Sequence, residues 1–172
     1  MRILYIVTQA DDGGAQTYTL LLAKHFGGAI AAGPSSVRLF EQAQNSGLTT
    51  FKLEHLKRSI IPWDDFFAVK EIRELIKNYE PDIVHLNSSK AGFLGSFAAM
   101  WLKTKVVYTA HGFIFNEPMV WVKKAFFIAL EKVASSFRDF IICVSTLTIN
   151  LPCILGLLNQ ASWLQSTMVF QW

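Results

Sequence analysis

Two short apolar runs, 83–86 and 106–108, constrain the fold of this 172-residue chain more than any other feature. Each run is too short for a helix and too continuous for a strand with one exposed face, so both are predicted to be buried parallel strands. The segment between them, from about Lys90, is apolar and long enough for a crossover helix. The stretch from Pro81 to Phe113 is therefore predicted to be the strand–helix–strand unit around which the chain folds.

The same alternation of strand and helix runs through the first 145 residues. Further strands are predicted at 2–8, 29–32, around Phe51 and Leu53, and at 139–144; further helices are predicted at 15–25, at 37–45, from a cap at Asp64 or Asp65 to Tyr79, and after Pro118. Regular alternation of this kind favours an α/β fold with a doubly wound, Rossmann-like parallel sheet.

Polar residues follow two of the predicted buried strands. Asn87, Ser88 and Ser89 can cap the helix that begins near Lys90, and the free N–H groups of its first turn can bind a sugar hydroxyl or a phosphate. His111 ends the next strand. Ligands of open α/β sheets sit at the carboxyl ends of the strands, so these five residues are predicted to line a binding site. For His111, a buried structural role is the alternative.

The first strand is followed by Gly13-Gly14 and then by a helix. Because glycine has no Cβ, a phosphate or sugar can approach the main chain there. The pattern is not GxGxxG, so it does not specify a dinucleotide, and a tight turn without a ligand is the alternative.

Composition excludes several classes of protein. Apolar residues make up 52% of the chain and the net charge is only +3, without the clustered basic and aromatic residues of a nucleic-acid site. No run reaches the length of a membrane span, and no signal peptide is recognised, which favours a cytoplasmic location. The cysteines, Cys143 and Cys153, have no metal-site or disulfide-framework spacing.

The helix after Pro118 has an unusual distribution of apolar residues. One stripe follows the helical period, namely Val122, Phe126, Leu130, Val133 and Phe137. Trp121 and Phe127 fall off that stripe, beside Lys123 and Lys124. The aromatic and lysine residues off the stripe form a face that can rest on a bilayer surface. Contact of these residues with the core or with a second domain is the alternative.

Five blocks of this sequence, in this order, resemble the retaining GT-B glycosyltransferases of sequence family 4, especially the bacterial capsule and exopolysaccharide enzymes. The blocks are TQADDGGAQTYTLLLA, AAGP, PDIVHLNSSKAGFLG, VVYTAHGFIFNEP and DFIICVS. They cover about residues 1–145. One departure is that such enzymes often carry a second histidine where this chain has Asn87.

The resemblance implies transfer of a sugar, with retention, from a nucleotide-sugar to a glycan or polyprenyl-linked acceptor. It places Gly13 and Gly14 near the donor diphosphate, makes His111 the catalytic residue over the donor sugar, and gives the acceptor side to Asn87, Ser88, Ser89 and Lys90. It implies no cofactor and no obligatory metal, because N–H groups and cations stabilise the leaving group. The helix after Pro118 adds the expectation of peripheral contact with the inner face of the plasma membrane, for which Trp121, Lys123, Lys124 and Phe127 are the candidates.

Two other functions fit the same fold. One is a module that binds a nucleotide or a lipid-linked sugar without chemistry. The other is a sugar-nucleotide epimerase, which should present carboxylates for proton abstraction, whereas the predicted rim carries amide, hydroxyl, ammonium and imidazole groups.

The last 27 residues, 146–172, differ from the rest. They contain no charged residue, no clear period and no counterpart in the family. Some codon choices for this peptide, read one nucleotide out of frame, would spell FDNQFALHIGFAKPSKLVTIHNGISM, which resembles the family's continuation. We therefore interpret 1–145 as an N-terminal, acceptor-side domain, 146–172 as an out-of-frame tail, and the C-terminal donor-binding domain as absent, so that the chain alone is expected to be inactive.

Overall fold

The computed structural model describes residues 1–8, 14–111 and 120–144. The strands are β1 (Ile3–Val7), β2 (Ala29–Ala32), β3 (Thr49–Lys52), β4 (Ile83–Leu86), β5 (Lys105–Ala110) and β6 (Phe140–Cys143). The helices are α1 (Gly14–Phe26), α2 (Val37–Gln44), α3 (Pro62–Tyr79), α4 (Ser89–Ala99) and α5 (Trp121–Ser135). Strands and helices alternate along these ranges, as predicted.

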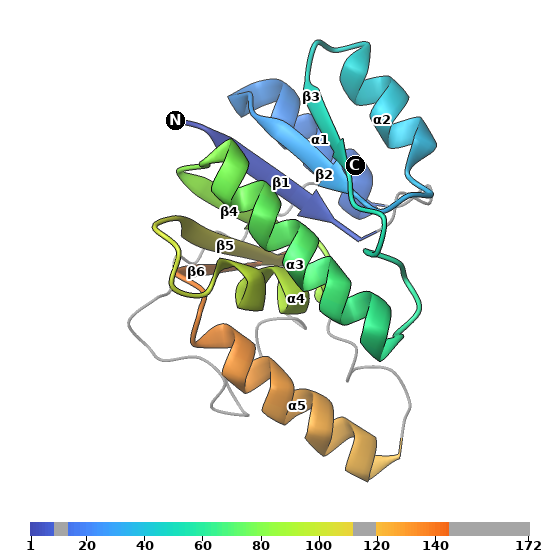
Figure 1. Cartoon of the computed structure of the whole chain (residues 1–172), viewed down its shortest axis with the longest axis vertical. Coiled ribbons are helices and arrows are strands. Elements are labelled where there is room, and N and C mark those ends of the chain that lie inside the picture. The colour runs from blue at the N-terminus through green and yellow to red at the C-terminus, as the bar shows by residue number, and fades with distance from the viewer. Residues whose placement is uncertain (9–13, 112–119, 145–172) are drawn as a thin grey trace.

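The strands form one parallel sheet in the order β3-β2-β1-β4-β5-β6 (Figure 1). The chain builds outward from β1 to β3 and then returns to place β4 on the other side of β1. Beyond β1 and β4 lies the topological switch point, where open α/β sheets bind ligands.

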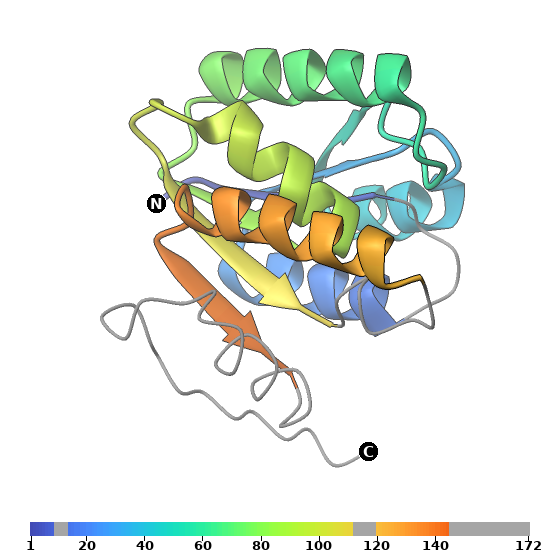
Figure 2. The ribbon, with the colours of Figure 1, turned by 90° about the horizontal axis from the view of Figure 1, so that it is seen from below.

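Helices cover both faces of the sheet (Figure 2). On one face, α1 and α2 bury apolar side chains against β1 and β2. On the other, α3 and α4 pack over the centre of the sheet, and α5 lies beside α4 with Phe127 and Ile128 against the same core. The predicted doubly wound fold is confirmed.

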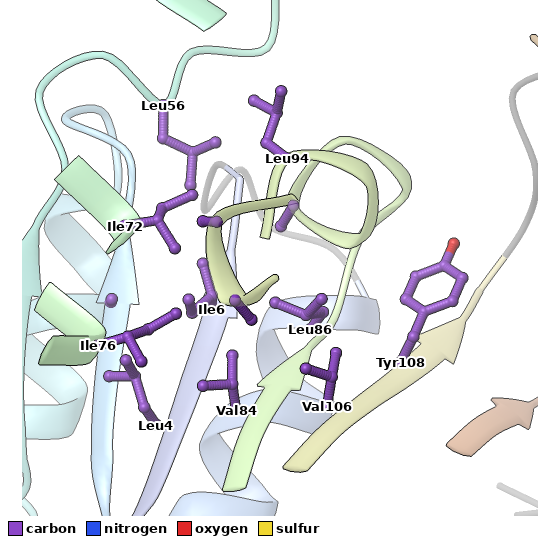
Figure 3. Packing of buried hydrophobic residues seen from close by; sticks show 14 of the residues in the cluster. Leu4, Ile6, Leu56, Ile72, Ile76, Val84, Leu86, Leu94, Val106 and Tyr108 are labelled. Carbon is purple, nitrogen blue, oxygen red and sulfur yellow. The ribbon is translucent and has the colours of Figure 1, made fainter. Parts of the chain in front are cut away.

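Alternating residues of the central strands fill the larger core. Leu4, Ile6, Val84 and Leu86 are completely buried between the sheet and α3 and α4 (Figure 3). Glycines let α4 approach the sheet closely, because a Cβ on Gly95 would lie 2.4 Å from Leu86 Cδ2. This close packing holds α4 against the end of β4.

The predicted cap of α3 was wrong. The helix begins at Pro62, its N-cap is Ile61, and no side chain caps it. Proline is favoured at the first helical position because its φ is already helical and its missing N–H would have no partner there. Asp64 and Asp65 lie in the first turn instead, where their charge favours the helix dipole and their carboxylates pair with lysines.

The predicted phase of α5 was wrong in part. Val122, Phe126 and Val133 of the predicted stripe are exposed, although Leu130 and Phe137 are half-buried. Phe127, a candidate for membrane contact, is half-buried against the core, as the alternative predicted. The inward face carries Glu131, whose carboxylate pairs with buried Arg138. Apolar residues occupy both sides of this helix, so hydrophobic period alone could not select the buried one.

Several predictions lie outside the described residues. Gly13, the segment 112–119 and the tail 146–172 are among them. The domain boundary at 145 and the out-of-frame tail stay predictions, which the nucleotide sequence through codon 172 would test. Among the described helices, none combines the length and apolarity needed to cross a bilayer.

Candidate functional site

The switch point is closed by hydrogen bonds between the end of β1 and the start of α4. The hydroxyls of Thr8 and Ser88 lie 2.6 Å apart, and Ser88 Oγ also accepts a hydrogen bond from the Thr8 N–H at 3.2 Å. Ala91 N–H donates to both hydroxyl oxygens, at 3.1 Å and 3.3 Å. Ser88 is thus the N-cap of α4, which confirms a cap within the predicted trio and engages its hydroxyl within the protein.

Asn87 is the most buried of the predicted site residues. Its side chain is fully enclosed, and Nδ2 donates to the carbonyl oxygen of His85 at 3.1 Å. Its Oδ1 has no hydrogen-bond partner among the described residues. A buried amide oxygen without a partner costs free energy, so this atom is available to accept a hydrogen bond from a ligand or from neighbouring chain.

Two histidines lie on one face of the sheet, toward the carboxyl ends of its strands. His85 Nε2 lies 2.8 Å from Thr109 Oγ1, and the Tyr18 ring meets both His85 (6.4 Å between centroids) and His111 (5.3 Å), edge to face. His85 lies in β4, and Asn87, two positions further on, is the first residue after this strand, so extended backbone directs both side chains to the same side of the sheet. The chain thus places a second histidine beside Asn87, although not at its position.

Both imidazoles are held neutral near pH 7. Burial, followed by the charge of His111, lowers the pKa of His85 to about 4. Burial alone lowers the pKa of His111. His111 Nε2 has no hydrogen-bond partner in the described part of the chain, so a neutral His111 can offer one hydrogen bond at the end of β5.

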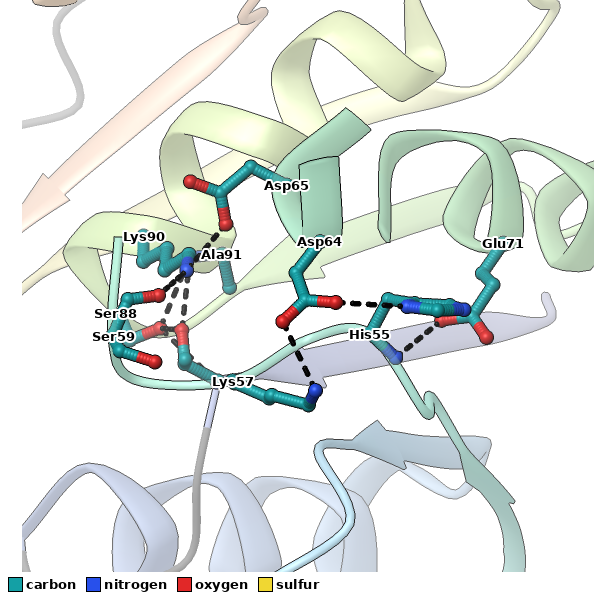
Figure 4. Close-up of polar contacts among 10 residues, drawn as sticks. His55, Lys57, Ser59, Asp64, Asp65, Glu71, Ser88, Lys90 and Ala91 are labelled. Atoms are coloured by element: carbon teal, nitrogen blue, oxygen red, sulfur yellow. Dashed lines mark hydrogen bonds and ion pairs between the residues drawn. The ribbon is translucent and has the colours of Figure 1, made fainter. Parts of the chain in front are cut away.

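Lys90 lies in the first turn of α4 but faces α3. Its ammonium group pairs with Asp65 Oδ1 and donates to the Ser59 carbonyl, each at 2.5 Å, and its side chain is only 15% exposed (Figure 4). A parallel contact joins Lys57 to Asp64 at 3.0 Å, and Lys57 first, then His55, hold the pKa of that carboxyl below its usual value. Lys90 therefore secures the segment between β3 and α3.

The remaining predicted residues lie at the starts of two helices. Ser89 is the first residue of α4 and is half-buried. Gly14 is the first residue of α1, and a Cβ built there would meet nothing within 4 Å. None of the described residues requires glycine at that position, which leaves room on their side for a group from outside.

The structure brings Asn87, Ser88 and His111 together at the carboxyl ends of the strands, near the start of α1. It directs Lys90 toward α3. Thr8, Tyr18 and His85 belong to the same edge but were not predicted as site residues. The alternation of β4 could have identified His85, since it shares a face with Asn87. No group of three or more potential metal ligands occurs among the described residues.

Residues 12–150 match the sequence profile described as Glycosyltransferase Family 4. The chain belongs to this family. Among its relatives, the Escherichia coli UDP-Gal:alpha-D-GlcNAc-diphosphoundecaprenol alpha-1,3-galactosyltransferase is 32% identical over 101 residues, 58% of this chain and 26% of that enzyme. The Escherichia coli O-antigen biosynthesis glycosyltransferase WbnH is 24% identical over 147 residues, 82% of this chain and 40% of WbnH.

Solved structures support the GT-B-type fold of this Family 4 chain. Anabaena Alr3699/HepE, crystallised with UDP, matches with a TM-score of 0.70 at 16% identity, over 91% of this chain and 41% of HepE. The UDP-GlcNAc 2-epimerase from Methanocaldococcus jannaschii matches with a TM-score of 0.61 at 14% identity, over 91% of this chain and 43% of that protein. The chain spans less than half the length of each of these proteins.

Proposed function

We propose that this Family 4 protein transfers a sugar from a nucleotide-sugar to a glycan or polyprenyl-linked acceptor in the synthesis of a cell-surface polysaccharide. The family match over 12–150 is the observation that carries the proposal. The named activity of its relatives, galactosyl transfer to a diphosphoundecaprenol-linked sugar in one case, supports the acceptor class. The solved complex of HepE with UDP supports a uridine nucleotide among the donors to be tested.

The proposed donor side lies beyond the ends of β1 and β5. Gly13 and Gly14 would lie near the diphosphate, an interpretation favoured by the open space around Gly14. His111 would act as the catalytic residue, its neutral imidazole donating to or accepting from a hydroxyl of the reacting sugar. Transfer would proceed with retention and without an obligatory metal, because N–H groups and cations would stabilise the departing nucleotide.

The proposed acceptor side lies beyond β4. Asn87 offers an amide oxygen that has no partner among the described residues, and Ser89 opens the first turn of α4. The contacts of Ser88 and Lys90 favour an indirect role for both, since Ser88 fixes the helix start and Lys90 fixes the segment before α3. A cytoplasmic enzyme at the inner face of the membrane would meet a polyprenyl-linked acceptor there. Exposed Trp121 with Lys123 and Lys124 would contribute to that contact, and Phe126 replaces Phe127 as its outward aromatic.

Transfer is tested with the longest translation product of the gene, because the chain covers less than half of its relatives. The protein is incubated with UDP-, GDP- and dTDP-sugars and a synthetic diphosphoprenol-linked sugar, and the acceptor is analysed by mass spectrometry. We expect a gain of one sugar residue with the anomeric configuration of the donor. His111→Ala should lower turnover by about 10²- to 10³-fold while leaving the fold intact.

The alternatives give different results in the same assay. Interconversion of UDP-sugars without transfer would assign the protein to the epimerases and overturn the proposal. Nucleotide binding without either reaction would indicate a binding module. The described residues that end β1, β4 and β5 include no carboxylate, which disfavours proton abstraction by that part of the edge.

A further inference from the structure

Large apolar side chains are exposed where α3 begins. Residues 57–61, which precede the helix, and its first two residues, Pro62 and Trp63, are all exposed, and so are Phe66 and Phe67. We define the α3 apolar surface as its five large apolar members: Ile60 (59% exposed), Ile61 (41%), Trp63 (76%), Phe66 (52%) and Phe67 (44%). Contiguous exposed apolar residues of this size mark a surface that contacts something else.

The α3 apolar surface is not needed to hold α3 on the sheet. The buried stripe of the helix is formed by Ala68, Ile72 and Ile76, which lie against the core. Trp63 and Phe66 lie off this stripe. Their exposure is therefore not explained by the packing of α3.

The charges around this surface suit an anionic partner. Asp64 and Asp65 are only 19% and 17% exposed, and each is paired with a lysine. The outer positions hold cations instead: Arg58 is exposed, and Lys70 Nζ lies 4.5 Å above the centre of the Phe66 ring. Carboxylates turned inward and paired, with cations beside exposed aromatics, match the pattern of surfaces that rest on anionic lipid.

The location of the surface points the same way. In both overall views, α3 and α5 run in the same direction and begin at the edge where the strands end (Figures 1 and 2). The start of α5 carries Trp121 (77% exposed) and Val122 (56%) next to Lys123 and Lys124. Both helix N-termini also carry partial positive charge, which favours lipid phosphates. Exposed aromatic and cationic groups thus lie at the starts of both α3 and α5, at the same end of the sheet as the candidate site.

From these observations we infer that the α3 apolar surface inserts into the headgroup region of an anionic bilayer, with Trp63 and Phe66 as the principal anchors. This contact is additional to that proposed for α5, and it does not depend on sugar transfer. A bilayer bound at this end of the sheet would bring membrane-anchored molecules close to the residues that follow β1 and β4.

Vesicle sedimentation tests the inference without an activity assay. The purified chain is mixed with phosphatidylcholine vesicles that contain or lack 30 mol% phosphatidylglycerol, a fraction on the order of that in anionic membranes. We expect binding to the anionic vesicles that weakens with added salt. Trp63→Ser/Phe66→Ser should lower the partition coefficient at least about tenfold, because each aromatic contributes apolar burial. Lys70→Glu should weaken binding to the anionic vesicles and leave binding to vesicles without phosphatidylglycerol unchanged.

Trp101→Ser is the matched control. Trp101 is 85% exposed, but it follows the C-terminal end of α4, at the end of the sheet where the strands begin. Its replacement should leave vesicle binding unchanged, and circular dichroism should show each variant folded. Absence of vesicle binding, or equal loss in the Trp101 variant, would overturn the inference. So would a wild-type dimer that the α3 double variant converts to monomer with vesicle binding unaltered, since a second copy would then be the partner.

Discussion

The hydroxyl oxygens of Thr8 and Ser88 lie 2.6 Å apart and join the end of β1 to the start of α4. The two residues are separated by 80 positions in the sequence, yet together they accept the hydrogen bond of the Ala91 N–H. This pair connects the two halves of the sheet at its switch point. It therefore links the position of the predicted donor side to that of the predicted acceptor side.

Ser88→Ala should lower the free energy of unfolding by about 1–2 kcal/mol, the usual effect of losing a serine N-cap. The substitution also removes the Ser88 Oγ that accepts the hydrogen bond of the Thr8 N–H. Ser35→Ala, at an exposed position before α2, should change the free energy of unfolding by less than about 0.5 kcal/mol. Urea unfolding of both variants measures the difference, and equal values would contradict a capping role for Ser88.

The sheet could be predicted from sequence because buried parallel strands are short, continuous apolar runs. The face of α5 could not, because the side that packs inward carries Glu131 and the side that faces outward carries Val122 and Phe126. The buried side is mixed: Phe127 and Ile128 pack against the core, and Arg138 provides the partner that lets Glu131 lie there. The N-cap of α4 followed from its local sequence, whereas Thr8 and Tyr18 join the site through contacts distant in sequence, which local patterns do not report.

Arg138→Met should destabilise the fold by about 3–5 kcal/mol, as expected when one member of a buried ion pair is removed. The Arg138 side chain is fully buried, its guanidinium lies 4.1 Å from the centre of the Tyr108 ring, and its Nε donates to Ser96 Oγ at 2.9 Å. The substitution leaves the Glu131 carboxylate, 13% exposed, without its counter-ion. Adding Glu131→Gln should restore part of the loss in urea unfolding.

The matched control for this pair is Lys105→Met. Lys105 and Asp139 form an ion pair at 2.7 Å, but Lys105 is 69% exposed. Removing an exposed partner should cost less than about 1 kcal/mol. A loss as large as that of Arg138→Met would show that burial does not distinguish the two pairs.

The free energy of unfolding should decrease as the pH falls from about 6.5 to about 4. The pKa of His85 is lowered to about 4 in the folded protein, whereas an unfolded histidine has a pKa of about 6.5. Between these values the unfolded chain binds a proton that folded His85 does not, so acid favours unfolding, by up to about 3 kcal/mol across this window. Tyr5, Tyr18 and His111 face the ring, and His111, whose pKa is also lowered, acts in the same direction.

His85→Gln should flatten this pH dependence, measured by urea unfolding at intervals from pH 4 to pH 7.5. His25→Gln is the matched control, because it replaces an exposed histidine near the end of α1. The same slope in wild type and His85→Gln would show that other groups produce it.

Gly14→Ala should separate a ligand effect from a folding effect. A Cβ at Gly14 meets no atom of the described residues within 4 Å, and Gly14 is not among the glycines with positive φ, so the free energy of unfolding should change by less than about 0.5 kcal/mol. Gly33→Ala gives the contrast: its Cβ would lie 2.1 Å from the Leu56 carbonyl oxygen, so that variant should be clearly destabilised.

If the donor diphosphate approaches the main chain at Gly14, the Gly14→Ala variant should bind the donor at least about tenfold more weakly, or by about 1.4 kcal/mol. Calorimetric titration of the longest gene product with the donor found in the transfer assay measures this, and unchanged affinity would exclude Gly14 from the donor site.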